Sequence, residues 1–149
     1  MPITWSFNSF DQLTVRELYA ILRLRNEVFV LEQNCVYQDA DNIDKISYHL
    51  TGWDEGTLAA YCRLIPPGIT FNYASIGRVV TSPNYRKKGA GKELMKLGIG
   101  FTLERFHCNK ITISAQLYLQ KFYESLGFVK ISSTYLEDNI PHIKMQLTM

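Results

Sequence analysis

The chain has 149 residues and a formal net charge of +2, and 46% of its residues are hydrophobic. This length and composition are typical of one folded domain over residues 1–149, and they exclude an intrinsically disordered chain. So small a net charge gives no general attraction to nucleic acid, and no apolar run reaches the ~20 residues of a membrane-spanning helix. We therefore expect neither nucleic acid nor a membrane as a partner.

The cysteines indicate the redox environment of the chain. Cys35, Cys62 and Cys108 are odd in number and irregular in spacing. This fits neither a disulfide framework nor a C-x-x-C metal site, so we expect reduced thiols and no bound metal. The first ten residues mix polar and apolar types and do not resemble a signal peptide. Together these features predict a cytoplasmic protein.

The first half of the chain predicts one helix among four strands. Residues 3–7 alternate apolar and polar, as a strand does. Thr14 and Glu17 form a T-x-x-E capping box before apolar residues at helical spacing, which predicts a helix over 14–30. Residues 31–45 are rich in Asp and Asn and are expected to form an irregular surface segment. Further strands are predicted at 46–53, 57–65 and 74–81, the first two as a hairpin.

The second half of the chain alternates helices and strands. A loop at 82–88 leads into a long helix at about 89–107, followed by a strand at 111–113. A short helix at 119–126 ends at Gly127, and the last two strands are predicted at 128–131 and 143–147. This alternation implies an α/β fold with a mixed sheet that carries helices on its faces.

Two glycines mark the passage from the strand at 74–81 to the long helix. Gly89 and Gly91 have no Cβ atom, so the backbone can approach a ligand closely. The free N–H groups of the first helical turn and the positive end of the helix dipole favour an anion there. Positive charge is added by Arg86, Lys87, Lys88 and Lys92. A pyrophosphate fits this combination, and a basic helix start exposed to solvent is the alternative.

Two common phosphate-binding loops do not match this stretch. A Walker A loop needs Ser or Thr after its lysine, whereas Glu93 follows Lys92. A dinucleotide fingerprint needs a third glycine after Gly89 and Gly91, and residues 88–95 do not supply one.

The loop resembles the R/Q-x-x-G-x-G/A loop of GNAT acetyltransferases. The matching residues are Arg86-Lys87-Lys88-Gly89-Ala90-Gly91, between a strand and a helix as in that family. The resemblance implies a GNAT-type mixed and mostly antiparallel sheet flanked by helices, with the co-substrate acetyl-CoA in the cleft after the fourth strand. It also implies that residues 86–92 wrap the CoA pyrophosphate. By the same alignment, the main chain of Val79, Val80 and Thr81 pairs with the pantetheine arm as an added strand does.

A second motif supports the resemblance. Residues 116–128 are similar to the second CoA motif of the family, N-x-x-A-x-x-F-Y-x-x-x-G-F, with Gln116 in place of Asn and Leu119 in place of a small residue. The alignment implies that Gln116, Phe122 and Tyr123 contact CoA, and that the Tyr123 phenol protonates the departing thiolate. For Tyr123 alone, a core position on an amphipathic helix would be the alternative.

Three further segments resemble the ElaA-like branch of the GNAT family. They are residues 24–39, residues 76–79 and residues 137–143. With the two CoA motifs, the resemblance spans nearly the whole chain. It implies the fold and the cofactor, but it does not identify the acceptor.

The resemblance implies an N-acetyltransferase that transfers acetyl directly to an amine of a small molecule or a protein. Main-chain N–H groups at a strand bulge would polarise the thioester carbonyl, with Val80 as the candidate. A base must take a proton from the amine. Glu32, His49 and His142 are the candidates, because their segments flank the expected acceptor cleft. For each of them a structural role, as a surface charge or a hydrogen-bonded histidine, is the alternative.

The acidic segment allows three interpretations. Asp39, Asp41 and Asp44 could attract a cationic acceptor such as a polyamine, an amino sugar or a lysine side chain. Calcium is the second interpretation, but the segment lacks the glycine and the terminal glutamate of an EF-hand. We favour the third, a solvated loop.

Two other functions compete with the enzyme. The first is a CoA-binding sensor module with a GNAT fold and no catalysis; the presence of both CoA motifs and of Tyr123 favours the enzyme. The second is acyl transfer in signalling, because residues 25–29 loosely resemble acyl-homoserine lactone synthases, which lack so clear a glycine loop. Many relatives of the family are dimers, so a homodimer is also open.

Overall fold

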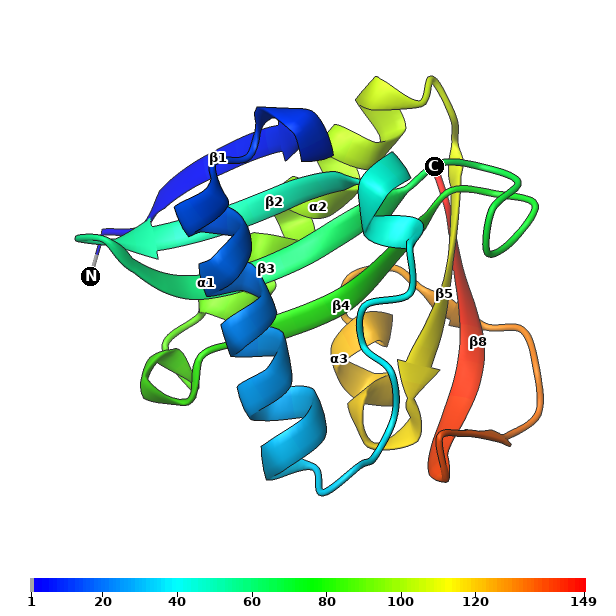
Figure 1. Cartoon of the computed structure of the whole chain (residues 1–149). Helices are drawn as coiled ribbons and strands as arrows, with labels where there is room; N and C mark the ends of the chain where they lie inside the picture. The colour runs from blue at the N-terminus through cyan, green and yellow to red at the C-terminus, as the bar shows by residue number, and fades with distance from the viewer. Residues whose placement is uncertain (1) are drawn as a thin grey trace.

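Two antiparallel sheets form the framework of the protein, seen in a computed structural model that describes residues 2–149 (Figure 1). The first sheet has the order β1-β2-β3-β4, and the second has the order β5-β8-β6 with β7 also paired to β8. The bounds are β1 (Thr4–Ser9), β2 (Tyr48–Asp54), β3 (Thr57–Ile65), β4 (Ser75–Thr81), β5 (Lys110–Gln116), β6 (Val129–Lys130), β7 (Tyr135–Glu137) and β8 (Ile140–Thr148). The predicted mostly antiparallel arrangement is confirmed, but it forms two sheets rather than one mixed sheet.

The first helix begins where its capping box predicts. Thr14 Oγ1 accepts a hydrogen bond from Glu17 N at 3.1 Å, and Glu17 Oε1 accepts one from Thr14 N at 2.8 Å. The helix α1 (Val15–Arg25) continues as a π-helical segment (Asn26–Glu32), so the predicted helix is confirmed and ends slightly later. Short π-helical turns inside α-helices are frequent at functional sites.

The remaining helices are α2 (Ala90–Arg105) and α3 (Gln120–Glu124). Short 3₁₀ turns occur at Phe10–Gln12, Ile43–Ile46, Pro83–Tyr85 and Leu117–Leu119. Within residues 2–149, none of the helices combines the length and the hydropathy needed to cross a membrane.

Helices cover both faces of the first sheet, with α1 on one side and α2 on the other (Figure 1). The core on the α1 side contains Ile21, Leu24, Val28, Leu58, Tyr61 and Val80. The larger core on the α2 side joins the two sheets through residues that include Leu64, Leu94, Ile111 and Met145. Alternate residues of the strands therefore pack against different helices, as the period of two in a strand requires.

Main-chain pairing joins the two sheets at one bridge among the described residues. Ala74 and Ile111 form an isolated parallel bridge, and Thr112 N donates a hydrogen bond to Ala74 O at 2.9 Å. Past this bridge no ladder pairing joins β4 to β5 in the part of the chain that the structure describes. A cleft opens between the two strands, and both contribute residues to its walls.

One strand and one turn were not predicted. β7 is followed by a tight turn in which Asp138 and Asn139 have φ angles of 50° and 64°, and the chain returns as β8. Asn and Asp are the residues that tolerate this left-handed conformation best after glycine. The turn brings the carboxylate of Glu137 to the cleft.

Candidate active site

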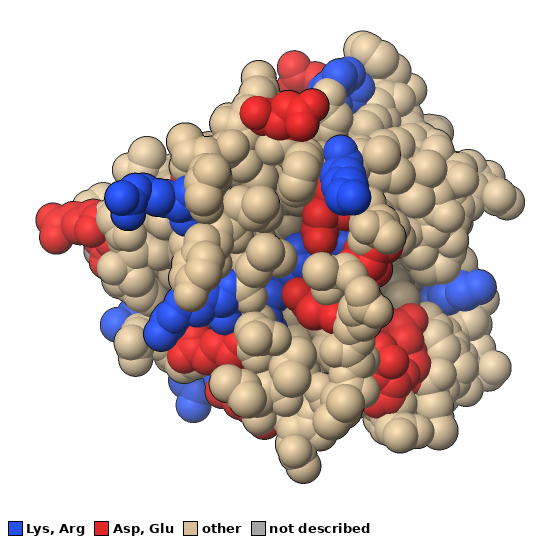
Figure 2. Space-filling model, in the orientation of Figure 1, with Lys and Arg blue, Asp and Glu red and all other residues tan. Residues whose placement is uncertain are grey.

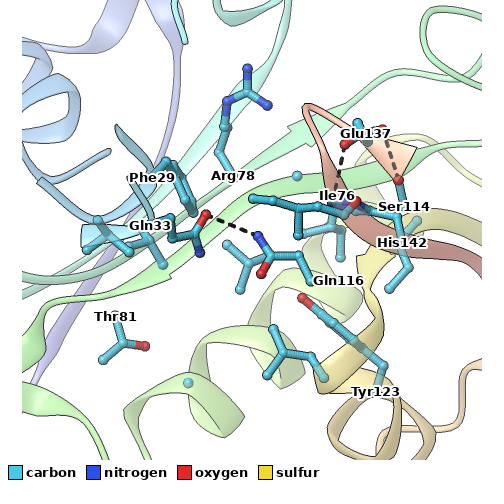
Figure 3. A pocket seen from close by; sticks show the side chains of 18 of the residues that line it. Phe29, Gln33, Ile76, Arg78, Thr81, Ser114, Gln116, Tyr123, Glu137 and His142 are labelled. Carbon is cyan, nitrogen blue, oxygen red and sulfur yellow. Dashed lines mark hydrogen bonds and ion pairs between the residues drawn. The ribbon is translucent and has the colours of Figure 1, made fainter. Parts of the chain in front are cut away.

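The cleft between β4 and β5 has a volume of about 960 Å³, within the usual range for sites that bind small molecules and cofactors. Figure 3 shows its side chains converging from the π-helical segment, β4, β5, α3 and β8. It brings together most of the site residues predicted from the sequence. These are Glu32, Val79, Val80, Thr81, Arg86, Lys87, Gly89, Gly91, Lys92, Gln116, Phe122, Tyr123 and His142.

The start of α2 provides an anion site at one end of this cleft. Gly89 is the N-cap and has a φ angle of 81°, a left-handed conformation that favours glycine. In the first main-chain hydrogen bond of α2, Glu93 N donates to Gly89 O at 3.1 Å. The N–H groups of Ala90, Gly91 and Lys92 therefore have no partner within the helix. A helix start with free N–H groups is suited to a phosphate group.

Two of the predicted loop residues do not line the cleft with their side chains. The Ala90 methyl group is buried and packs toward the core. The Lys88 Nζ lies 5.9 Å from the centre of the Tyr85 ring. The basic side chains that do line the cleft are those of Arg86, Lys87 and Lys92, so the loop contributes its charge through three side chains rather than four.

Glu32 is paired with Arg86 at the cofactor end of the cleft. Arg86 Nη1 lies 2.9 Å from Glu32 Oε2, and Arg86 Nη2 makes a second contact with Oε1. The hydrogen bonds of Arg86 lower the pKa of the Glu32 carboxyl. A carboxylate with a lowered pKa is a weaker proton acceptor. In this arrangement Glu32 neutralises part of the charge of Arg86, and its role as a base stays a prediction.

Tyr123 lies in the core and also reaches the cleft. Its ring is within 5.2 Å of the Phe122 ring and 5.9 Å of the Phe128 ring, measured between centroids. In Figure 3 the hydroxyl group points into the cleft, toward Gln116. Burial raises the pKa of the phenol, so Tyr123 keeps its proton at neutral pH. The core position and the predicted contact with the cofactor are thus compatible.

Gln116 joins the two walls of the cleft. Its Nε2 atom donates a hydrogen bond to Gln33 Oε1 at 3.3 Å, between the end of β5 and the end of the π-helical segment. The sequence did not indicate Gln33 as a site residue, because a polar residue after a helix has no local pattern that distinguishes it from a surface position.

A bulge in β4 lies beside the anion site. Gly77 pairs with Arg63 and Val80 pairs with Tyr61, so Arg78 and Val79 together face the single residue Cys62. Arg78 has a φ angle of 50°. A bulge leaves a residue without a ladder partner, so main-chain groups here are available to a ligand. The expected bulge exists, immediately before Val80; the role of Val80 itself stays a prediction.

His142 is held in one tautomer on the opposite wall. Its Nδ1 atom lies 2.6 Å from Ile140 O, and because a carbonyl oxygen only accepts, Nδ1 carries the proton. The neutral ring then has its lone pair on Nε2, which lies 3.5 Å from Glu137 Oε2. Ser114 Oγ donates to Glu137 Oε1 at 3.1 Å and also contacts Tyr135 Oη at 2.5 Å. These contacts hold the Glu137 carboxylate beside His142 Nε2 at the wall of the cleft.

His49 does not belong to the site. It is fully buried between the first sheet and the segment before it, and it does not line the cleft. Nε2 donates to Asp44 O at 2.9 Å, and Nδ1 accepts from Tyr61 Oη at 2.6 Å. Burial lowers the pKa of this imidazole. Both ring nitrogens are occupied and the ring is neutral, so the assignment of His49 as a candidate base was wrong.

The acidic segment is not a solvated loop. Its carboxylates form ion pairs with three arginines, of which Arg25 and Arg63 are buried, in what we call the arginine–aspartate network. The pairs are Arg25 with Asp39 (2.8 Å) and Asp44 (2.7 Å), Arg63 with Asp41 (2.7 Å) and Asp44 (3.0 Å), and Arg78 with Asp39 (2.8 Å) and Asp41 (3.3 Å). Acidic and basic side chains accordingly lie next to one another in the middle of the face in Figure 2. The negative charge is neutralised inside the protein, so these residues do not attract a cationic acceptor.

Calcium does not explain the segment either. Within residues 2–149, no group of three or more His, Cys, Asp or Glu side chains is arranged to hold a metal ion. The arginines that bind the carboxylates come from α1, β3 and β4, far along the chain, which is why the local sequence did not predict the network.

We expect the network to contribute strongly to stability. Arg25→Met should lower the free energy of unfolding by about 3–5 kcal/mol, because it leaves the carboxylates of Asp39 and Asp44 buried without a full set of partners. Urea unfolding at pH 7 measures this, with Arg23→Met, an exposed position on the same helix, as the control. A loss equal to that of the control would contradict the role of the network.

The network also predicts sensitivity to acid. Burial would raise the pKa of Asp41, but the hydrogen bonds and charge of Arg63 outweigh it and lower the pKa to about 2. A lowered folded-state pKa contributes stability that is present above about pH 4 and lost as the pH falls toward 2. An Arg63→Met variant, which lacks the main partner of Asp41, should therefore differ less from the natural protein at pH 2 than at pH 7.

Comparisons with known proteins agree with this geometry. The sequence model of the family described as "Acetyltransferase (GNAT) domain" matches residues 20–149. A UPF0039 protein of Schizosaccharomyces pombe is 43% identical over 145 residues, which cover 96% of this chain and 95% of that protein. An acyl-CoA N-acyltransferase from Pseudomonas aeruginosa has 40% sequence identity to this chain. Its crystal structure superposes on 99% of this chain and 100% of its own chain, with a TM-score of 0.93.

The ElaA resemblance is confirmed in the same way. The crystal structure of Escherichia coli ElaA is 36% identical, with a TM-score of 0.92 over 98% of this chain and 99% of that one. The predicted GNAT fold is therefore confirmed, including its cleft beside the fourth strand. The chain belongs to the GNAT acetyltransferase family, in the branch that contains ElaA.

Proposed function

We propose that the protein transfers an acetyl group from acetyl-CoA directly to an amine. The observation that carries the proposal is the continuity of one cleft, which joins the anion site at the start of α2 to the Tyr123 hydroxyl and to the His142–Glu137 pair. The acyl-CoA N-acyltransferase of P. aeruginosa, 40% identical to this chain, supports the class of donor.

The donor end of the cleft suits the phosphates of CoA. The free N–H groups of Ala90, Gly91 and Lys92 and the side chains of Arg86, Lys87 and Lys92 would hold the pyrophosphate. Gly91 keeps the approach open, because a Cβ atom there would already lie 3.4 Å from Thr81 Oγ1. The unpaired main chain at the β4 bulge would bind the thioester end of the donor.

The other residues supply the proton transfers. The amine nitrogen attacks the thioester carbonyl carbon, and main-chain N–H groups at Arg78, Val79 or Val80 stabilise the developing oxyanion. His142 Nε2 takes the proton that the amine loses, and Glu137 balances the resulting charge. The carbon–sulfur bond breaks, and Tyr123 gives its proton to the departing thiolate.

Binding of acetyl-CoA is the direct test of the donor end. Saturating acetyl-CoA should stabilise the protein by about 2.7 kcal/mol when its concentration is 100 times Kd. Gly91→Val should abolish this gain, since a branched side chain would occupy the space of the phosphates. Calorimetry and thermal melting measure both, with Gly100→Val as the control, because that glycine lies on the same helix and a Cβ atom there would meet open space. Unchanged affinity in Gly91→Val would refute the phosphate assignment.

A further inference from the structure

The end of the cleft farthest from the basic loop at 86–92 is acidic. The charged side chains that line this end are those of Asp41, Arg78, Glu137 and Asp138. Asp41 and Arg78 are neutralised within the arginine–aspartate network. Within residues 2–149, neither Glu137 nor Asp138 forms an ion pair with a lysine or an arginine; the one charged-group contact is that of Glu137 with His142. Two negative charges therefore remain at this end.

Two hydrogen-bond acceptors face each other at the same place. His142 is only 6% exposed, and because Nδ1 donates its proton to Ile140 O, Nε2 presents a lone pair. Glu137 Oε2, 3.5 Å away, belongs to a carboxylate and can only accept. No N–H or O–H group in the described part of the chain donates to either atom. A nearly buried acceptor without a donor points to a ligand or a water.

The space between the two acceptors is open to the cleft. Glu137 and His142 both line it, and the Glu137 side chain is 50% exposed (Figure 3). A nitrogen about 2.9 Å from each acceptor would donate to both at ordinary hydrogen-bond length. An ammonium group has three N–H bonds, so it can direct two of them to this pair and keep its carbon substituent in the cleft.

The pair lies at the level of the bulge in β4. Val79, in the bulge, and Gln116 are each five residues past the parallel bridge that joins β4 to β5. Strands rise by a similar distance per residue, so these two residues lie at about the same level. Gln116 pairs with His142 across the β5–β8 ladder. A nitrogen held by His142 and Glu137 thus lies across the cleft from a carbonyl held at the bulge.

The surrounding charges determine which amines fit. Arg78 is the cation that lines this end, and its charge is already balanced in the network. Lys144 Nζ lies over the Phe71 ring, 5.6 Å from its centre, and forms no ion pair with Glu137. A carboxylate next to the amine nitrogen would face Glu137 and Asp138 without a free cation to offset the repulsion.

We propose that Glu137 and His142 form a subsite that binds the acceptor as its ammonium ion, with one nitrogen donating to both side chains. The acceptors are then primary amines that are protonated at neutral pH and carry no carboxylate beside the nitrogen, so α-amino acids are poor acceptors. This rests on the proposed acetyl transfer. On going from ammonium to amide the nitrogen loses two protons: one passes to His142 Nε2, and the other balances the proton that the thiolate receives from Tyr123.

Glu137→Gln tests the subsite, because the amide keeps the size of the side chain and removes its charge. The assay measures CoA release from acetyl-CoA with ethylamine, an ammonium ion at pH 7, and with 2,2,2-trifluoroethylamine, which is neutral. We expect KM for ethylamine to rise about tenfold, the size of one hydrogen bond to a charged group, and KM for trifluoroethylamine to change less than twofold. Glu104→Gln, at an exposed position outside the cleft, is the control. An equal change for both amines would overturn the subsite.

The exclusion of carboxylates has its own measurement. Alaninamide and alanine share a skeleton, and only alanine carries a carboxylate beside the ammonium group. In the natural protein kcat/KM should be at least tenfold higher for alaninamide, and the difference should narrow in Glu137→Gln. Equal values for the two amines in the natural protein would overturn the proposed substrate class.

NMR tests the same contact without turnover. With CoA bound, the His142 Hε1 resonance should shift on addition of ethylamine at constant pH and ionic strength, and Glu137→Gln should need about tenfold more ethylamine for the same shift. Such a shift without CoA release from acetyl-CoA by any amine would leave the subsite standing and refute the proposed transfer. No shift with ethylamine would mean that water occupies the space between the two acceptors, and the subsite would be refuted whether or not transfer occurs.

Discussion

Tyr123→Phe should lower the turnover number by something on the order of 10²- to 10⁴-fold, the usual contribution of a general acid. The substitution removes the hydroxyl group that points into the cleft and keeps the ring that packs against Phe122 and Phe128. Because burial keeps the phenol protonated, the natural residue is ready to donate at neutral pH. Melting temperature and acetyl-CoA affinity should change little, since neither depends on the hydroxyl.

Varying the thiol leaving group of the acyl donor tests the role of Tyr123 as an acid more directly. Acyl donors with a more acidic thiol need less protonation as the carbon–sulfur bond breaks, so the loss in Tyr123→Phe should shrink for such donors. A purely structural role predicts the opposite pattern, with a change in stability and an equal effect on all donors. Full activity in Tyr123→Phe would leave Tyr123 as a core residue and make solvent the proton donor.

The fold was largely predictable because its signals are local. The capping box of Thr14 and Glu17, the hairpin about residues 54–56 and the glycine after residue 126 each depend on neighbours within a few positions. The phosphate loop was predictable for the same reason, since its glycines and its helix start are adjacent. β7 was missed because three residues carry too little periodicity.

The surroundings of the acidic segment and of the histidines were not predictable, because they are assembled from distant segments. The aspartates at 39–44 are paired with arginines at 25, 63 and 78. Their charges are evident in the sequence, but the neutralisation of these charges is evident only in the folded structure. His49 and His142 are equal candidates in sequence, and only their surroundings separate them: His142 lines the cleft, whereas both nitrogens of His49 have partners inside the core.

The second large loss of activity is expected from a substitution of His142, the histidine that lines the cleft. His142→Gln should lower kcat/KM for the amine on the order of 10²- to 10⁴-fold, because glutamine cannot take a proton at the position of Nε2. Steady-state rates of CoA release measure this loss, with His107→Gln, at an exposed position, as the control.

Two comparisons separate proton transfer from packing. Glu137→Gln keeps a polar side chain near Ser114 but removes the charge 3.5 Å from His142 Nε2, so its loss should be smaller than that of His142→Gln. Weakly basic amines are already neutral at pH 7 and give up their proton more readily after the attack, so the deficit of His142→Gln should be least for them. If the deficit were the same for weakly and strongly basic amines, His142 would serve to shape the cleft, and the proton would leave through water.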